Sequence, residues 1–191
     1  MTTLLAPPTT LPDEFRPLTR EEYNRLIDLG VFEGARVQLV GGLLIEMTPQ
    51  EDPHFQLVVD LNMMLAHQVH GRHSVNVQGP LQVDDISEPE PDLSILPLPR
   101  YGGVGKTGEA LLVIEVAESS LALDLGEKAR RYAAAGYPEY WVIDAVKRVV
   151  IRHTDPKPDG TWTTVEHLTD GVIEPVAVAD VTVDLDELFD V

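Results

Sequence analysis

The order of apolar patterns along the chain predicts a mixed α/β (α+β) fold with one central β-sheet flanked by helices. Short runs rich in β-branched and aromatic residues alternate with stretches of helical period along the whole chain. Hydrophobic residues form 43% of the 191 residues, an ordinary fraction for a globular protein with a core. We expect a single domain over residues 18–191, preceded by a Pro- and Thr-rich extended arm over residues 1–17.

Local boundary signals place the first elements. The Thr19–Glu22 capping box should open a helix that ends at Gly30. Gly41-Gly42 lies between two apolar runs and indicates a hairpin with a two-residue turn. Asp52-Pro53 is typical of an N-cap followed by proline at the first helical position, and the helix it opens should stop at Gly71.

Further strands and one further helix follow from apolar runs and turn residues. The expected strands are 74–78, 81–83, 92–96, 111–117, 139–144, 149–153 and 161–167. A helix should span about 124–135 and end at Gly136, and a Gly-rich loop should lie at 102–108. Residues 181–191 are expected to form an acidic helical tail.

The charge of the chain argues against non-specific DNA binding. The formal net charge is −18, whereas proteins that bind DNA normally present a basic surface to the phosphates. Nine of the fourteen basic residues fall within residues 100–157, which leaves room for a local phosphate-facing surface.

Neither a membrane span nor a secretory signal is visible in the sequence. No apolar run approaches the roughly 18 residues that a membrane helix needs, and the first residues lack a basic and apolar leader. The chain has no cysteine, so it can form neither a disulfide nor a thiolate metal site. We expect a cytoplasmic protein without membrane contact.

The most informative residue is Glu115, because it lies inside the apolar run 111–117. An unpaired buried carboxylate costs several kcal/mol, so a compensating partner is expected. Asp92 leads into another apolar run, and Lys128 lies in the helix that follows Glu115. Taken singly, Asp92 could be a turn former and Lys128 a solvated helix residue. Together, two strand acids and a helix lysine fit a metal-dependent phosphodiesterase.

The two acids suit Mg²⁺, which prefers hard oxygen ligands and binds through one or two carboxylates plus waters and substrate phosphate. Asp92 and Glu115 on neighbouring strands would bring such carboxylates to one edge of the sheet. The backbone carbonyl of Val116 would be a further ligand, and Mn²⁺ a substitute ion. Lys128 would orient the attacking water or steady the phosphate.

Several stretches together resemble the Uma-type restriction endonuclease family of the PD-(D/E)XK nuclease superfamily. They cover roughly residues 18–190, and the most specific part is 111–144. The stretches are Leu39 to Met47, Pro91-Asp92, Val113 to Val116, Ser119-Ser120, Asp124 to Lys128 and Tyr132 to Asp144.

The resemblance implies a restriction-endonuclease-like core, a mixed sheet flanked by helices, and divalent-metal cleavage of phosphodiesters. It assigns the acidic roles to Asp92 and Glu115. The lysine that usually follows two residues after the second acid is replaced by Ala117, and Lys128 matches the relocated position.

Further matches to the family pattern concern the hairpin and the helix after it. Glu46 matches an auxiliary acid and His54 a histidine near it, although they could equally be a hairpin acid and a helix residue with local hydrogen bonds. Family acids are replaced here by Gln38 and Gly41. We interpret both replacements as peripheral.

These observations favour a Mg²⁺-dependent endonuclease that hydrolyses DNA phosphodiester bonds, with Asp92, Glu115, Lys128 and Glu46 in the active site. The acidic charge keeps two alternatives open. One is a non-catalytic interaction protein on a nuclease scaffold, and the other is a phosphodiesterase acting on RNA or a small phosphodiester. A homodimer would let two sites cut two strands, but the sequence shows no self-complementary patch.

Overall fold

The fold is given by a computed structural model that describes residues 15–47, 52–98 and 108–190. Most of the expected arm (1–17) and of the Gly-rich loop (102–108) therefore lies outside the described residues, and the single domain over 18–191 stays a prediction. The helical segments are α1 (Arg20–Asp28), α2 (Asp52–Val69), α3 (Leu121–Leu123), the π-turn η1 (Asp124–Lys128), α4 (Ala129–Ala134) and α5 (Leu185–Phe189). The strands are β1 (Val37–Val40), β2 (Leu43–Glu46), β3 (His73–Val77), β4 (Leu93–Pro97), β5 (Leu112–Ala117), β6 (Glu139–Asp144), β7 (Val149–Pro156), β8 (Trp162–Leu168), β9 (Val172–Ile173) and β10 (Val183–Asp184).

Six strands form one central sheet in the order β3-β4-β5-β6-β7-β8. The pair β5–β6 is parallel, whereas the other neighbours in this sheet are antiparallel. The parallel pair requires a crossover, which α3, η1 and α4 supply between the two strands. The mixed central sheet is therefore confirmed, and β5 lies inside it with a neighbour on each side.

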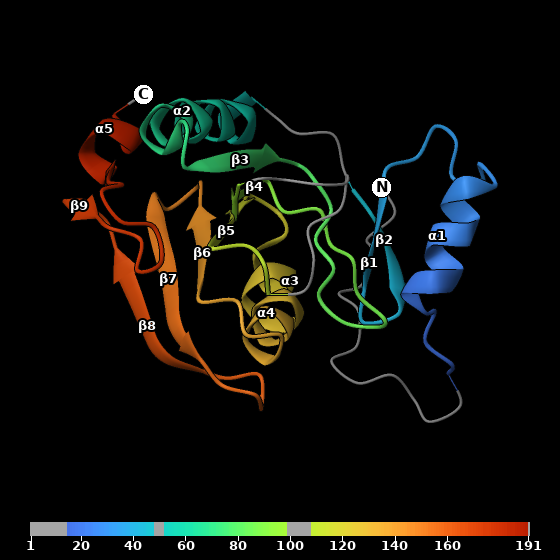
Figure 1. Cartoon of the computed structure of the whole chain (residues 1–191). Coiled ribbons are helices and arrows are strands. Elements are labelled where there is room, and N and C mark those ends of the chain that lie inside the picture. Colours follow the sequence, from blue (N-terminus) through green and yellow to red (C-terminus); the bar gives the residue numbers. More distant parts are fainter. Residues whose placement is uncertain (1–14, 48–51, 99–107, 191) are drawn as a thin grey trace.

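Both faces of the sheet are covered, as Figure 1 shows. Alternate residues of β5 point to opposite faces. Ile114 and Val116 pack in a core with α2 and the C-terminal elements, whereas Val113 and Ala117 pack in a second core with α4. Every residue of β5 is buried as a result, including Glu115.

The hairpin β1–β2 and helix α1 lie beside the sheet, away from β7 and β8 (Figure 1). The hairpin joins the segment before β4 through a bridge between Leu39 and Glu88. The Tyr23 hydroxyl of α1 donates a hydrogen bond of 2.8 Å to the Val37 carbonyl. These contacts set β2 at the edge of the region where β4 begins and β5 ends.

Local signals were sound where they depend on neighbouring residues. The Thr19–Glu22 capping box is formed, and α1 begins there. Gly41-Gly42 connects β1 to β2 with positive φ at both glycines. Gly136, at φ +78°, follows the C-cap of α4. α2 begins at Asp52 itself, and the residues just before it lie outside the described ranges.

Three expectations need correction, and one strand was not predicted. Residues 81–83 do not form a strand, because the chain folds back and bonds locally to residues 87–89, and prolines nearby lack the N–H that a longer ladder needs. The helix expected at 124–135 begins at Leu121 and contains a π-turn. The C-terminal tail has a short strand, β10, before a helix of only five residues. The partner of β10 is β9, which was not predicted.

None of the helices in the described part of the chain is long and apolar enough to cross a membrane.

Candidate active site

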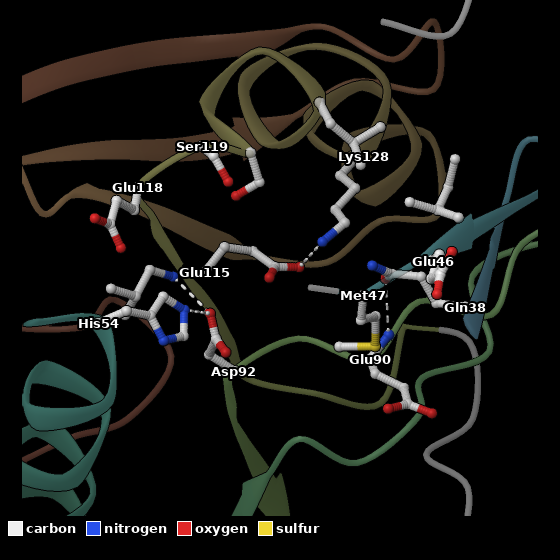
Figure 2. Close-up of a pocket in the computed structure, with 14 residues that line it drawn as sticks. Gln38, Glu46, Met47, His54, Glu90, Asp92, Glu115, Glu118, Ser119 and Lys128 are labelled. Atoms are coloured by element: carbon white, nitrogen blue, oxygen red, sulfur yellow. Dashed lines mark hydrogen bonds and ion pairs between the residues drawn. The ribbon is translucent and has the colours of Figure 1, made fainter. Parts of the chain in front are cut away.

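A cleft of about 350 Å³ opens where the start of β4, the end of β5, strand β2 and the first turn of α2 meet η1. Its lining includes all four side chains expected in the active site, Glu46, Asp92, Glu115 and Lys128 (Figure 2). The structure therefore brings the predicted residues to one place.

The two principal carboxylates lie on neighbouring strands, as expected. The antiparallel register pairs Leu93 with Ile114, so the residue before β4, Asp92, falls opposite Glu115 when the register is extended by one residue. Residues opposite one another in an antiparallel pair lie on the same face. Asp92 also accepts a hydrogen bond of 2.9 Å on Oδ2 from the Val116 N–H. The backbone of Val116 thus lies at the site.

Glu115 finds its partner in Lys128. The Lys128 ammonium donates a hydrogen bond of 2.9 Å to Glu115 Oε1, and both residues are only 4% exposed. A second carboxylate, Asp124, places Oδ1 at 3.0 Å from the same Lys128 nitrogen. Asp124 in turn accepts a short hydrogen bond from the Ser120 hydroxyl. The compensation expected for a buried Glu115 is therefore present.

The π-turn η1 presents Asp124 and Lys128 to the strand. Its defining hydrogen bond runs from the Ala129 N–H to the Asp124 carbonyl, five residues back. The same carbonyl accepts a hydrogen bond of 3.0 Å from the Tyr140 hydroxyl of β6. A single π-turn within a helix is frequent at functional sites. Here the bond from the Tyr140 hydroxyl connects the π-turn to strand β6 of the sheet.

Burial and charge decide the ionisation of this cluster. Burial raises the pKa of Glu115 well above 4.5; Lys128 opposes the rise, while the charges of Asp124 and Asp92 add to it. Burial would lower the pKa of Lys128, but Asp124 and Glu115 outweigh it, so the pKa of Lys128 is raised. Lys128 is therefore a persistent cation and unsuited to act as a general base.

His54, in the first turn of α2, reaches the site from the opposite face of the sheet. Its Nε2 lies 3.1 Å from Asp92 Oδ2, and among the residues that the structure describes its buried Nδ1 has no hydrogen-bond partner. Burial lowers the pKa of His54, but Asp92 and the backbone of Val116 outweigh it and raise the pKa. Asp92 is thus held by a main-chain donor and a histidine.

The rim of the cleft is acidic. Glu46 is exposed on β2 and lines the cleft together with Glu90 and Glu118 (Figure 2). Glu46 is exposed, whereas Asp92 and Lys128 are buried, so Glu46 stands at the periphery. Gln38 is buried and lines the cleft, so the replacement of the family acid at this position is not peripheral.

The sequence reasoning missed Asp124 and Ser120 as parts of the site. The spacing of Asp124, four residues before Lys128, was the available signal, because residues at i and i+4 of a helix share a face. Within the described residues, no group of three or more His, Asp or Glu side chains is arranged to hold a metal ion. A metal would thus depend on two carboxylates, backbone oxygen and water.

Comparison with known proteins agrees with the fold. The chain matches the family Uma2, described as "Putative restriction endonuclease", over residues 20–186. A crystal structure described as a "putative nuclease belonging to DUF820" from Anabaena variabilis ATCC 29413 superposes with a TM-score of 0.76 at 14% identity, covering 91% of this chain and 98% of that one. No curated protein matches the chain. Because the family match spans most of the sequence, the chain belongs to the Uma2 family, and it shares the fold of this solved structure.

Proposed function

We propose that this protein is a metal-dependent endonuclease that hydrolyses phosphodiester bonds in DNA, with Mg²⁺ as its ion and Mn²⁺ as a substitute. The observation that carries the proposal is the position of Asp92 beside the buried Glu115–Lys128 pair in one cleft. Membership of a family described as "Putative restriction endonuclease" supports phosphodiester cleavage as the reaction. The Asp92 and Glu115 carboxyl groups and the Lys128 ammonium would supply the chemistry.

The donor set fits a hard divalent cation. Asp92 and Glu115 offer carboxylate oxygens, and Val116 places backbone polar atoms beside them. Burial raises the pKa of Glu115, and the negative charges of Asp124 and Asp92 raise it further; a cation would relieve this repulsion. A bound divalent ion supplies a polarised phosphoryl oxygen and a water of lowered pKa. Asp92, Glu115 and the Val116 carbonyl would hold it.

The protein's own residues would arrange the reacting groups. Lys128 is held as a cation and would stabilise negative charge on the phosphate or orient the attacking water. The Val116 N–H and His54 fix the Asp92 carboxylate, which reduces the reorganisation needed when a ligand binds. Glu46 would act at the rim as an auxiliary acid.

The acidic rim bears on the substrate. Glu46, Glu90 and Glu118 repel a polyanion, and a net charge of −18 adds long-range repulsion. This repulsion favours a second candidate, hydrolysis of RNA or a small phosphodiester. The non-catalytic alternative is less favoured, because keeping a charged cluster buried has an energetic cost that a purely structural role would not require.

The test is a parallel assay on plasmid DNA, a single-stranded RNA and a chromogenic phosphodiester, each with Mg²⁺, with Mn²⁺ and with chelator. We expect ion-dependent cleavage that falls at least about 100-fold in Asp92→Asn and in Glu115→Gln, because each would remove several kcal/mol of transition-state stabilisation. The control is Glu166→Gln, an exposed acid on β8. Calorimetric titration with Mn²⁺ should detect binding to the wild type and the control but not to Asp92→Asn.

Cleavage confined to RNA or the small phosphodiester would replace DNA as the substrate. Equal activity of the wild type and the two site variants would refute the active site. No cleavage and no Mn²⁺ binding would favour the non-catalytic alternative.

We also propose that the protein acts on duplex DNA as a homodimer and in the cytoplasm. A dimer would place two clefts on two strands. Light scattering during size-exclusion chromatography measures the mass, for which 21.1 kDa is one chain. A monomer that nicks only one strand would contradict the dimer.

A further inference from the structure

Lys128 has two carboxylate neighbours, although one would neutralise it. Glu115 Oε1 accepts its hydrogen bond at 2.9 Å, and Asp124 Oδ1 lies 3.0 Å from the same nitrogen. Asp124 is 1% exposed, so its charge is fully withdrawn from water. The cluster thus places two buried carboxyl groups around a single lysine.

Stability does not account for this extra acid. A buried ion pair is often no better for stability than apolar residues of similar volume, and a second carboxylate adds repulsion with Glu115. The Asp124 Oδ1 atom is buried, and within the described residues its 3.0 Å contact with the Lys128 ammonium is not a well-aligned hydrogen bond. Its contact with Lys128 is therefore mainly a charge interaction. Such an arrangement calls for a role beyond folding.

Asp124 is itself held rigidly. Its other carboxylate oxygen accepts the short hydrogen bond from Ser120, which precedes α3. Its carbonyl accepts hydrogen bonds from the Ala129 N–H and the Tyr140 hydroxyl. Hydrogen bonds thus hold both the side chain and the main chain of Asp124. Its carboxylate therefore has a fixed position next to the Lys128 ammonium.

The ammonium keeps donors for a ligand. An ammonium has three N–H donors, and within the described residues Lys128 directs one of them to Glu115. Lys128 also lines the cleft, so its remaining N–H groups can meet a water or a phosphate oxygen there. The ammonium is thus shared between Glu115 Oε1 at 2.9 Å and Asp124 Oδ1 at 3.0 Å.

We propose that Asp124, held by Ser120, is a positioning residue that fixes the Lys128 ammonium between Glu115 and the cleft. The proposal rests on the proposed function of the same site. Asp124 touches neither substrate nor ion, and it acts through Lys128.

The test combines kinetics with a measurement that needs no activity. The variants are Asp124→Asn, Ser120→Ala and Ser120→Thr, and the control is Glu127→Gln. Glu127 lies in the same π-turn but pairs with Arg130 and Arg131 instead of Lys128. Cleavage kinetics give kcat and KM. NMR on protein labelled at lysine gives the solvent-exchange rate of the Lys128 ammonium protons, assigned with Lys128→Met.

We expect kcat to fall about 10- to 100-fold in Asp124→Asn, as for partners that orient active-site groups, with KM nearly unchanged. Ser120→Ala should fall less, and Ser120→Thr, which keeps the hydroxyl, should recover most of the loss. The ammonium protons should exchange faster in Asp124→Asn and Ser120→Ala than in the wild type. Glu127→Gln should match the wild type in both measurements.

Unchanged kcat and unchanged proton exchange in Asp124→Asn would overturn the proposal. If Asp124→Asn does not fold, Ser120→Ala tests the proposal instead, because it retains the Glu115 and Asp124 carboxyl groups and removes only the hydrogen bond from Ser120 to Asp124. If the wild type cleaves no substrate, the proposed function fails, and proton exchange alone then decides whether Asp124 positions Lys128.

Discussion

Removal of the Lys128 charge is the sharpest test of the buried cluster. At an effective dielectric constant of about 20, each of the two ion contacts of Lys128 is worth about 6 kcal/mol before desolvation is subtracted. Burial offsets much of this attraction. Leaving a buried partner unpaired typically costs about 3–5 kcal/mol, and we expect Lys128→Met to lose about that amount at about pH 8.

The loss should depend on pH in a defined direction. Burial already raises the pKa of Glu115, and Lys128 opposes the rise, so removing Lys128 raises it further. A carboxyl whose folded pKa is raised contributes stability below its unfolded pKa, and this contribution is lost as the pH rises through the folded pKa. Lys128→Met should therefore be destabilised less at about pH 5 than at about pH 8.

The assay is urea unfolding followed by the fluorescence of Trp141 and Trp162, with the midpoint and slope compared at both pH values. The matched control is Lys147→Met. Lys147 also pairs with an aspartate, Asp144, at 3.1 Å, but its side chain is 71% exposed. A surface pair of this kind is worth about 0–1 kcal/mol. The reasoning is refuted if Lys128→Met is no less stable than Lys147→Met.

Three further predictions concern buried polar groups on strands β6 and β7. Tyr140→Phe removes one of the two donors to the Asp124 carbonyl and should cost about 0.5–1.5 kcal/mol in urea unfolding, because that carbonyl keeps its bond from the Ala129 N–H; a loss below about 0.5 kcal/mol would mean that the hydroxyl does not hold the π-turn. Glu139→Gln weakens the buried pair with Arg152, at 2.7 Å, and should cost about 3–5 kcal/mol, with near wild-type stability as the contradicting result. Burial lowers the pKa of His153 below 6.5, so its contribution to stability is present above about pH 6.5 and is lost as the pH falls through the folded pKa. His153→Gln should therefore lose less stability than the wild type between about pH 7 and pH 5, and parallel pH profiles would contradict this.

Elements with strong local signals were predicted well. The capping box at Thr19 and the turn at Gly41-Gly42 act through residues adjacent in sequence, and both were confirmed. The prediction of a strand at 81–83 was wrong. The apolar residues there follow a strand pattern, but whether a neighbouring strand is present to pair with them depends on residues elsewhere in the chain. The π-turn could not be predicted either, because the Asp124 carbonyl within it is bonded by Tyr140, which lies on strand β6.

In the site, too, the residues with a local sequence signal were predicted and those that depend on distant contacts were not. Glu115 was recognisable because a charge inside an apolar run stands out, and Lys128 is its partner as expected. Asp124 was overlooked because an acid four residues before a lysine is most often an exposed surface pair. Asp124 is buried and contacts the Lys128 ammonium because the fold packs η1 against β5, and the sequence alone does not show this packing.

The mixed fold, and the acids and lysine of the candidate site, could be predicted from short stretches of sequence. The spacing of apolar residues, the caps and a single charge among apolar neighbours are properties of a few consecutive residues. Three relations came from the folded chain instead: Asp92 falls opposite Glu115, Gln38 lines the cleft, and Asp124 shares Lys128 with Glu115. These relations depend on strand register and on the packing of a helix against a sheet, and both are set by contacts between residues far apart in the chain.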